Sequence, residues 1–209
     1  MDWTALYLKT SGLKVFILGT GEVASRRANK FLDHGAIVRL AGNSISDDIK
    51  SKGAELYSTD DVDDLIDWAD LVVVASADKD LSNYVSEMSE DKLLNRADFP
   101  YDGDIIVPTS FNISDIEISI FTNGKSPLMA KQLRKRIQSI ITEDDILEIE
   151  LQDYSRSLLK GYVSNQKDRR DYLYEIFENE EIQELIKPRK IDEAKSVIFE
   201  LIQGDFDDT

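Results

Sequence analysis

Three aspartates near the middle of the chain could take part in chemistry. Residues 97–104 read ADFPYDGD, so Asp98, Asp102 and Asp104 fall within seven positions of one another. A carboxylate held beside a bound substrate can act as a general base. Aspartates next to proline and glycine also form ordinary turns. Residue types alone leave both interpretations open, so the elements that position this segment decide what it can do.

A glycine-containing turn near the N-terminus could bind phosphate groups. Residues 19–24 read GTGEVA and fit the pattern G-x-G-x-x-A. The first glycine permits a tight turn from strand to helix, the second lets the backbone approach a pyrophosphate, and the alanine allows close packing of the helix. The phosphates would lie at the helix N-terminus, where the dipole favours an anion. The expected cofactor contacts in this turn are Gly19, Thr20, Gly21, Glu22, Val23 and Ala24.

The surroundings of this turn favour a dinucleotide site over a purely structural turn. An apolar run at residues 13–18 precedes it, and a helical pattern runs from Val23 until Gly35. A strand directly before the glycines and a helix directly after them are the context that such a site requires. We therefore predict a dinucleotide cofactor, with a structural turn as the alternative.

The end of the second expected strand bears on the choice between NAD and NADP. An acid at this position would bind the ribose 2′-hydroxyl, but the sequence has Asn43 and Ser44 there. Asn43 can still bond a ribose, whereas Arg39 would favour a 2′-phosphate if it pointed toward it. We predict NAD, with Asn43 and Ser44 as contacts, together with Ser76 and Ala77 after the fourth strand.

The hydrophobic pattern before residue 93 alternates between strands and helices. Strands are expected at residues 13–18, 36–42, 54–58 and 70–76, and each is followed by a helical segment. Four such repeats predict an α/β fold with an N-terminal Rossmann-type parallel sheet and helices on both faces. Asp98 would then lie at the carboxyl edge of the sheet, where open α/β folds bind ligands.

The pattern changes after residue 104. Residues 104–111 and 116–122 are expected to be strands with no helix between them, and residues 126–142 have a helical period. From about residue 145 the chain is helical and acidic. We expect three parts, which are a nucleotide-binding domain at residues 1–112, a small α+β region at residues 113–144 and a helical C-terminal domain at residues 145–209.

Composition excludes several kinds of site. The 209 residues include no cysteine and one histidine, His34, so disulfides, thiolate nucleophiles and zinc–cysteine sites are excluded, and we expect no metal site. The net charge of −16 argues against a nucleic-acid partner. We see no apolar run of the length that a membrane span needs and no signal-peptide pattern, so we expect a cytoplasmic protein without a membrane partner.

Four segments together resemble the precorrin-2 dehydrogenase family, which includes the N-terminal module of siroheme synthases. They are residues 6–42, 69–83, 95–111 and 116–138. The first carries the glycine turn, and the second the fourth strand with Asn83. The third is similar to the segment that holds the family's catalytic aspartate, and the fourth to its strand, T-x-G-x-SP turn and basic helix. The last two are the more specific, because a generic Rossmann domain has neither.

The resemblance implies NAD-dependent oxidation of precorrin-2 to sirohydrochlorin in siroheme biosynthesis, with Asp98 as the catalytic carboxylate. Precorrin-2 is a tetrapyrrole with eight carboxylates, and the expected contacts to it are Asn83, Lys125, Ser126 and Arg134. Residues 124–138 suit such an anion, because they contain five basic residues and no acid. The family also forms dimers through the region after the sheet. We therefore expect a homodimer that uses residues 113–144.

The chain departs from the family pattern at two places. Thr20 replaces the middle glycine of the usual triple-glycine turn, and Asn95 and Arg96 stand where the family has an apolar VN-V run. Three alternatives stay open, which are a bifunctional enzyme that also inserts ferrous iron, a degenerate member that binds tetrapyrrole without turnover, and a nucleotide-sensing Rossmann regulatory module. The sensing module would be expected to have an acid after the second strand and no NGKSP turn, and this chain has the opposite.

Overall fold

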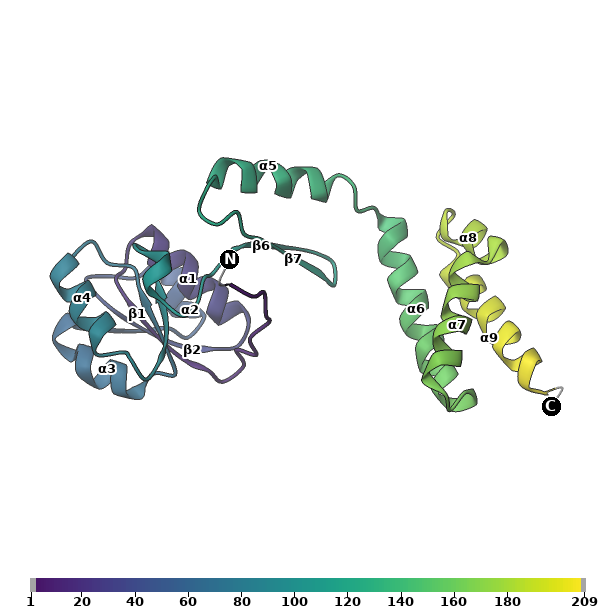
Figure 1. The fold of residues 1–209 in the computed structure, drawn as a ribbon, viewed down its shortest axis with the longest axis horizontal. Coiled ribbons are helices and arrows are strands. Elements are labelled where there is room, and N and C mark those ends of the chain that lie inside the picture. The colour runs from purple at the N-terminus through teal and green to yellow at the C-terminus, as the bar shows by residue number, and fades with distance from the viewer. Residues whose placement is uncertain (1–2, 208–209) are drawn as a thin grey trace. The chain divides into compact units, whose positions relative to one another are not determined.

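The chain divides after Val107 into two compact units (Figure 1). The computed structural model describes residues 3–207. Each unit buries apolar residues of its own, with two core clusters in the first and one in the second. The predicted three-part division, with boundaries after residues 112 and 144, stays a prediction.

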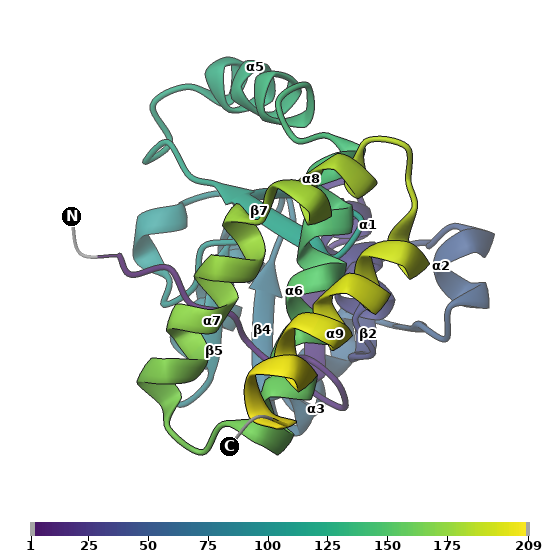
Figure 2. The same ribbon diagram turned by 90° about the vertical axis from the view of Figure 1, so that its right-hand side faces the viewer.

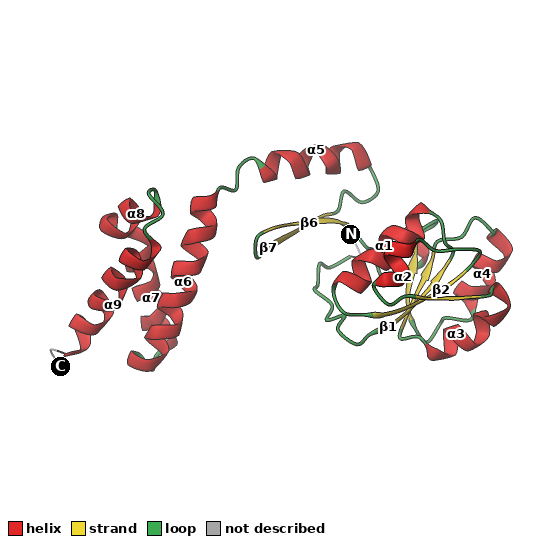
Figure 3. Ribbon diagram, turned by 180° about the vertical axis from the view of Figure 1, so that it is seen from behind, coloured by secondary structure: helices red, strands yellow, loops and turns green. Residues whose placement is uncertain are grey.

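The first unit alternates strands and helices along its length. Its elements are β1 (Lys14–Leu18), α1 (Glu22–Asp33), β2 (Ile37–Ala41), α2 (Asp47–Ser51), β3 (Glu55–Tyr57), the 3-10 turn η1 (Thr59–Asp61), α3 (Val62–Trp68), β4 (Leu71–Val74), α4 (Lys79–Glu87), β5 (Leu93–Arg96) and the 3-10 turn η2 (Pro100–Asp102). The strands pair in parallel in the order β3-β2-β1-β4-β5, seen in yellow in Figure 3. This arrangement confirms the predicted α/β fold with a Rossmann-type sheet.

Helices cover both faces of this sheet because its central strands are apolar on both sides. Val15 and Ile17 of β1 face α1 and α2, whereas Phe16 and Leu18 face α3 and α4. All four residues of β4 are buried, as an uninterrupted apolar run of this kind predicts. The core therefore holds β1 and β4 in place at the centre of the sheet, and the loops that follow them are placed by the core.

The second unit begins with a hairpin and a helix. Strands β6 (Thr109–Ile113) and β7 (Ile116–Ile120) pair antiparallel, and α5 (Pro127–Gln138) contacts both. The predicted start of the strand at residues 104–111 was wrong, because residues 104–108 are not in a strand and β6 begins at Thr109. Ile105 and Val107 pack against the core of the first unit instead.

Four helices complete the second unit, namely α6 (Glu143–Tyr162), α7 (Gln166–Glu178), α8 (Glu180–Ile186) and α9 (Ile191–Asp207). Figure 2 shows α6 running beside α7 and α9, and these pairs are in contact. Their buried residues include Leu151, Leu159, Ile176 and Ile198. The four helices therefore enclose a packed core of their own, in the region that the sequence predicts to be helical. Within residues 3–207, no helix is both long enough and apolar enough to cross a bilayer.

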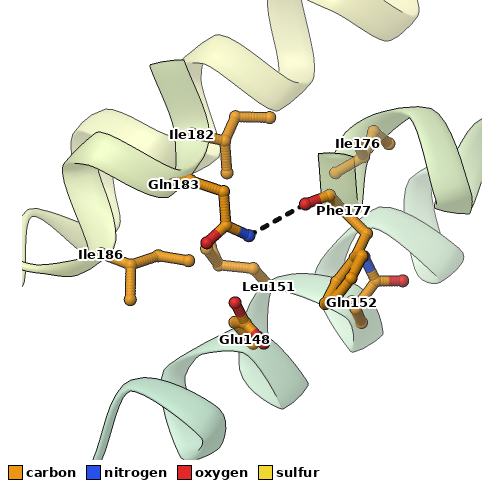
Figure 4. Close-up of a pocket in the computed structure, with 8 residues that line it drawn as sticks. All are labelled: Glu148, Leu151, Gln152, Ile176, Phe177, Ile182, Gln183 and Ile186. Carbon is orange, nitrogen blue, oxygen red and sulfur yellow. Dashed lines mark hydrogen bonds between the residues drawn. The ribbon is translucent and has the colours of Figure 1, made fainter. Parts of the chain in front are cut away.

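A small hollow lies on this bundle between α6, α7 and α8 (Figure 4). Apolar side chains of Leu151, Ile176 and Ile182 line it, and the side-chain amide of Gln183 donates to the carbonyl oxygen of Phe177 at 2.9 Å across it. Four of its eight lining residues, Leu151, Ile176, Ile182 and Ile186, also belong to the core of the bundle. The hollow therefore belongs to helix packing and contains none of the predicted site residues.

Candidate functional site

The glycine turn between β1 and α1 has room for a ligand above its second glycine. Gly19 has a φ of +110°, and a Cβ atom there would lie 2.4 Å from the carbonyl oxygen of Ala75. At Gly21, by contrast, a Cβ atom would meet nothing within 4 Å. Gly21 is the N-cap of α1 and makes no side-chain cap hydrogen bond. The first turn of α1 thus keeps backbone N–H groups that can bind an anion.

Thr20, the departure from a triple-glycine turn, packs against the end of β2. A Cβ atom on Gly42 would lie 2.7 Å from Cγ2 of Thr20. The missing side chain at residue 42 therefore makes space for the extra side chain at residue 20. The turn keeps its strand-to-helix path with Thr20 present, and Gly19 still approaches the backbone after β4.

The strand register brings the other predicted cofactor residues to the same edge of the sheet. Leu18 lies opposite both Ala41 and Val74, and Val74 lies opposite Arg96, so four neighbouring strands end at one level. Asn43 and Ser44 follow β2, and Ser76 and Ala77 follow β4. Asn43, Ser44 and Ala77 are exposed, while the hydroxyl of Ser76 accepts a hydrogen bond from the backbone N–H of Asp78 at 3.1 Å.

Arg39 lies two residues before the end of β2 and is engaged within the protein. Its Nε donates to Oε2 of Glu55 at 2.9 Å. Its guanidinium carbon lies 4.2 Å from the ring centroid of Trp68 and 5.1 Å from that of Tyr57. The hydroxyl of Tyr57 donates to the same Glu55 oxygen. This cluster ties Arg39 to β3 and α3.

Asp98, the predicted catalytic residue, is held by Arg96. The Nε of Arg96 donates to Oδ1 of Asp98 at 2.9 Å, and Nη2 of Arg96 donates to Oδ2 at 2.6 Å. The side chain of Arg96 is 6% exposed and that of Asp98 is 25% exposed. Arg96 is the last residue of β5 and Asp98 lies in the bend that follows, so the two side chains meet just beyond the end of the strand.

Helix α4 supports the guanidinium of Arg96 from the other side. Nη1 donates to Oγ of Ser86 at 3.0 Å, and both terminal nitrogens lie 3.4 Å from Oδ1 of Asn83. The ring of Phe99 lies 5.4 Å from the guanidinium carbon. Asn83, predicted as a substrate contact, is thus a neighbour of the Arg96–Asp98 pair.

The ion pair determines the protonation of both partners. The hydrogen bonds from Arg96 lower the pKa of Asp98 below its ordinary value, against the opposing effect of desolvation. The same contact raises the pKa of Arg96. Asp98 is therefore a carboxylate at neutral pH, and its negative charge lies at the edge of the sheet two residues after β5.

The segment after Asp98 is anchored to β5. Oδ2 of Asp104 accepts the backbone N–H of Leu94 at 3.2 Å, and the side-chain amide of Asn95 donates to the carbonyl oxygen of Ile105 at 2.7 Å. A Cβ atom on Gly103 would lie 2.6 Å from the carbonyl oxygen of Leu94. Asp104 thus has a structural hydrogen bond that holds this segment against β5.

The remaining predicted substrate residues lie in the second unit. Ser126 is the N-cap of α5, and its hydroxyl accepts the backbone N–H of Met129 at 3.1 Å. Lys125 precedes it in a turn closed by its backbone N–H to the carbonyl oxygen of Thr122. The guanidinium carbon of Arg134 lies 5.2 Å from the ring centroid of Phe111. These three residues share one helix and its entry turn.

Comparison with known proteins identifies the family. The family model described as "Putative NAD(P)-binding" matches residues 6–109. A protein of Methanocaldococcus jannaschii named "Putative precorrin-2 dehydrogenase" is 31% identical over 195 residues, which cover 87% of this chain and 93% of that protein. The chain belongs to the precorrin-2 dehydrogenase family. The precorrin-2 dehydrogenase of Methanosarcina barkeri is 29% identical, with 87% of this chain and 85% of that protein covered.

A solved member of the precorrin-2 dehydrogenase family has the same fold. The structure titled "SirC, precorrin-2 dehydrogenase" matches with a TM-score of 0.73 and 24% identity, and the match covers 93% of this chain and 99% of that one. The siroheme synthase of Pseudomonas fluorescens is 24% identical over 98% of this chain but only 45% of its own length. The resemblance predicted from four sequence segments is thereby confirmed for the chain as a whole.

The residues of the first unit fit a nicotinamide dinucleotide. The open space above Gly21 and the α1 N-terminus without a side-chain cap suit a pyrophosphate. A larger residue in place of Gly21 would fill that space. The fit rests on the turn itself, because it needs neither a metal nor a side-chain cation.

Sequence reasoning treated Arg96 only as a departure from the family pattern and did not identify its contact with Asp98. A signal was present in the sequence, since Arg96 closely follows the apolar pair Leu93 and Leu94 and an acid, Asp98, lies two positions further on. The contacts of Arg96 with Ser86 and Asn83 could not be read from spacing, because they depend on how α4 packs on the sheet.

Proposed function

We propose that this protein oxidises precorrin-2 to sirohydrochlorin with a nicotinamide dinucleotide as hydride acceptor, a step of siroheme biosynthesis. The proposal rests on the 31% identity that runs along 87% of the chain to the precorrin-2 dehydrogenase relative. The glycine turn gives the relationship a physical basis, because it has the open space and the free helix N-terminus that the cofactor requires.

The residues at the edge of the sheet have different proposed roles. The cofactor, when bound, accepts a hydride from the substrate. The N–H groups after Gly21 bind its pyrophosphate, and Asn43, Ser44, Ser76 and Ala77 are the proposed contacts along the neighbouring strand ends. We propose Asp98 as the catalytic residue, because it presents a partly exposed carboxylate at that same edge.

NAD is the proposed cofactor in preference to NADP. Binding a 2′-phosphate requires a free cation near the end of β2. Arg39 is the basic residue of that strand, and it is bonded to Glu55 and stacked on Trp68. Asn43 follows β2 and can hydrogen-bond a ribose hydroxyl, which supports a ribose that carries no 2′-phosphate.

The carboxylates of the substrate are proposed to bind Asn83, Lys125, Ser126 and Arg134. The basic character of α5 supports this assignment for the last three. Ser126 contributes through the helix N-terminus more than through its hydroxyl, because that oxygen already accepts the N–H of Met129. The guanidinium of Arg134 is placed by its contact with the ring of Phe111.

A homodimer is the proposed assembly. Within residues 3–207, β6 and β7 form a two-stranded sheet, so both are edge strands, the kind of strand that a second chain can extend. Leu128 and Ile140 are each 66% exposed and add apolar surface nearby in the sequence. A mass of one chain by light scattering at micromolar concentration would contradict this proposal.

The expected cytoplasmic location stays a prediction that cell fractionation can test.

An absorbance assay tests the proposed activity. Purified protein is mixed with precorrin-2 and NAD⁺, and the reaction is followed by the formation of NADH and by the spectrum of the product. We expect sirohydrochlorin only when protein and cofactor are both present. If neither NAD⁺ nor NADP⁺ supports product formation, the enzyme proposal fails, and measured binding of either nucleotide would then favour a sensing module. Ferrous iron added after oxidation tests metal insertion as a separate activity.

A further inference from the structure

Arg96 contacts Asp98 in the geometry that binds a carboxylate most tightly. Nε and Nη2 each donate to a different oxygen, at 2.9 Å and 2.6 Å. Two parallel N–H···O bonds fix both the position and the plane of a carboxylate, which a single contact does not. Both oxygens of Asp98 are therefore already hydrogen-bonded before any substrate arrives.

The guanidinium is itself held in place. Arg96 is 5% exposed, and its remaining donors point to Ser86 and Asn83 of α4. The last residues of β4 and β5 are paired in register, with Val74 opposite Arg96, so the backbone of the arginine is fixed as well. A buried guanidinium with this many fixed partners cannot turn away at small cost, since a lone buried charge is strongly unfavourable.

We propose that Arg96 is a positioning residue for the dehydrogenase reaction, which holds Asp98 as an oriented carboxylate that stabilises positive charge on the substrate. This inference rests on the proposed function and goes beyond it, because it assigns Asp98 an electrostatic role in place of the general-base role that a carboxylate beside a substrate can have. Arg96 acts through Asp98 and is not proposed to touch the substrate.

The charge balance of the oxidation fits this role. A C–H bond of the macrocycle breaks, its electron pair leaves with the hydrogen to the nicotinamide, and the substrate is left with one additional positive charge. A fixed carboxylate nearby stabilises that charge as it develops. The substrate then loses one proton to water, and this step needs no protonation of Asp98.

The charged groups around the pair determine how the ionisation of Asp98 depends on pH. Asp98 and Asp102 are the carboxylates that act on Arg96, and α4 contributes the uncharged Ser86 and Asn83. Arg96 lowers the pKa of Asp98, so the wild-type carboxylate stays ionised well into the acidic range. Without Arg96, the pKa of Asp98 should rise, because the hydrogen bonds that lower it are lost.

Carbon NMR of the full-length protein tests the ion pair without any substrate. The ¹³C shift of the Asp98 carboxyl, assigned by its loss in Asp98→Asn, is followed from pH 7 downward in the wild type, Arg96→Gln and Arg96→Lys. We expect the midpoint to rise in Arg96→Gln and to rise less in Arg96→Lys, because lysine keeps the positive charge but cannot make the paired hydrogen bonds to both Asp98 oxygens. Arg39→Gln is the matched control, because it removes another strand arginine paired with a carboxylate, and it should leave the Asp98 midpoint unchanged.

Kinetics test the positioning role. The value of kcat/KM should stay level toward acidic pH in the wild type and should gain an acidic limb in Arg96→Gln at the midpoint measured by NMR. We expect a loss of about tenfold at pH 7 from disorder of the carboxylate, and no further loss when Arg96→Gln is added to Asp98→Asn.

Two results would overturn the proposal. The first is an Asp98 midpoint that is the same in the wild type and Arg96→Gln, with both variants folded by circular dichroism. The second is a further loss of activity in the double variant, which would show that Arg96 acts independently of Asp98. If the wild type has no dehydrogenase activity but the NMR midpoints move as expected, the proposed function fails while the ion pair stands.

Discussion

Gly19 packs so closely on Ala75 that a Cβ atom at residue 19 would lie 2.4 Å from the Ala75 carbonyl oxygen. The turn after β1 and the turn after β4 are thereby locked together at the edge of the sheet. Gly21, two residues later, has open space where its side chain would be. The two glycines of this motif thus have different roles, since Gly19 permits the close packing of the two turns and Gly21 leaves room for a ligand.

This difference predicts opposite effects for two alanine substitutions. Gly21→Ala should fold normally, because its φ of −75° suits any residue and its Cβ meets nothing. The added methyl group should weaken NAD⁺ binding at least about tenfold, since it lies where the pyrophosphate approaches the backbone. Isothermal titration calorimetry gives the affinity, and thermal unfolding gives the stability.

Gly19→Ala is the matched control, and its main effect should be a loss of stability, whereas that of Gly21→Ala should be a loss of NAD⁺ binding. Its positive φ and its collision with a backbone carbonyl should together cost about 3 kcal/mol of unfolding free energy. Urea unfolding followed by tryptophan fluorescence measures this loss, because both tryptophans, Trp3 and Trp68, belong to the first unit. Equal stability of the two alanine variants would contradict the assignment of separate roles.

Cofactor preference should respond to a single change after β2. Asn43→Asp places an acid where a ribose 2′-hydroxyl would bind and where a 2′-phosphate would be repelled. We expect the ratio of kcat/KM for NAD⁺ to that for NADP⁺ to rise by about tenfold, which is the effect of roughly 1.4 kcal/mol. Steady-state kinetics with both cofactors measure the ratio. An unchanged ratio would show that residue 43 does not contact the ribose.

Replacement of Asp98 should abolish most of the activity without loss of cofactor binding. Asp98→Asn keeps the size of the side chain but removes its charge, and we expect kcat to fall by about a hundredfold. NAD⁺ affinity should stay within about twofold, because the glycine turn is unchanged. Asp102→Asn is the matched control in the adjacent turn and should retain most of the activity. Asp104 is unsuitable as a control, because its carboxylate accepts the N–H of Leu94.

Most of the first unit could be predicted from local pattern. The apolar runs at Val15–Leu18 and Leu71–Val74 are buried on both faces, so their sequence alone indicates central parallel strands. The glycine turn was placed correctly because strand, turn and helix are adjacent in the chain. The helical pattern was expected to run until Gly35, and the preceding residue, His34, is the C-cap of α1, where its Nδ1 lies 2.7 Å from the carbonyl oxygen of Lys30.

Contacts between elements distant in sequence could not be predicted in the same way. The partners of Arg96 come from α4, ten and thirteen residues earlier, and no periodicity encodes their approach. The contacts of Arg39 with the rings of Trp68 and Tyr57 depend on how α3 and β3 pack beside β2. The start of β6 was misplaced for a related reason, because the apolar residues Ile105 and Val107 serve the core of the first unit and not a strand.

The Arg96–Asp98 pair should also make stability depend on pH. The pKa of Asp98 is lowered in the folded protein, so its contribution to stability is fully present above the unfolded value of about 3.9 and is lost as pH falls through the folded value. Asp98→Asn should therefore be less stable than the wild type by about 2 kcal/mol at pH 6, because it leaves a buried guanidinium without its counter-charge. That difference should shrink toward pH 3. Urea unfolding of the first unit, followed by tryptophan fluorescence at both pH values, measures it, with Asp102→Asn as the control. A difference that stays constant between pH 6 and pH 3 would mean that the charge of Asp98 does not stabilise the fold.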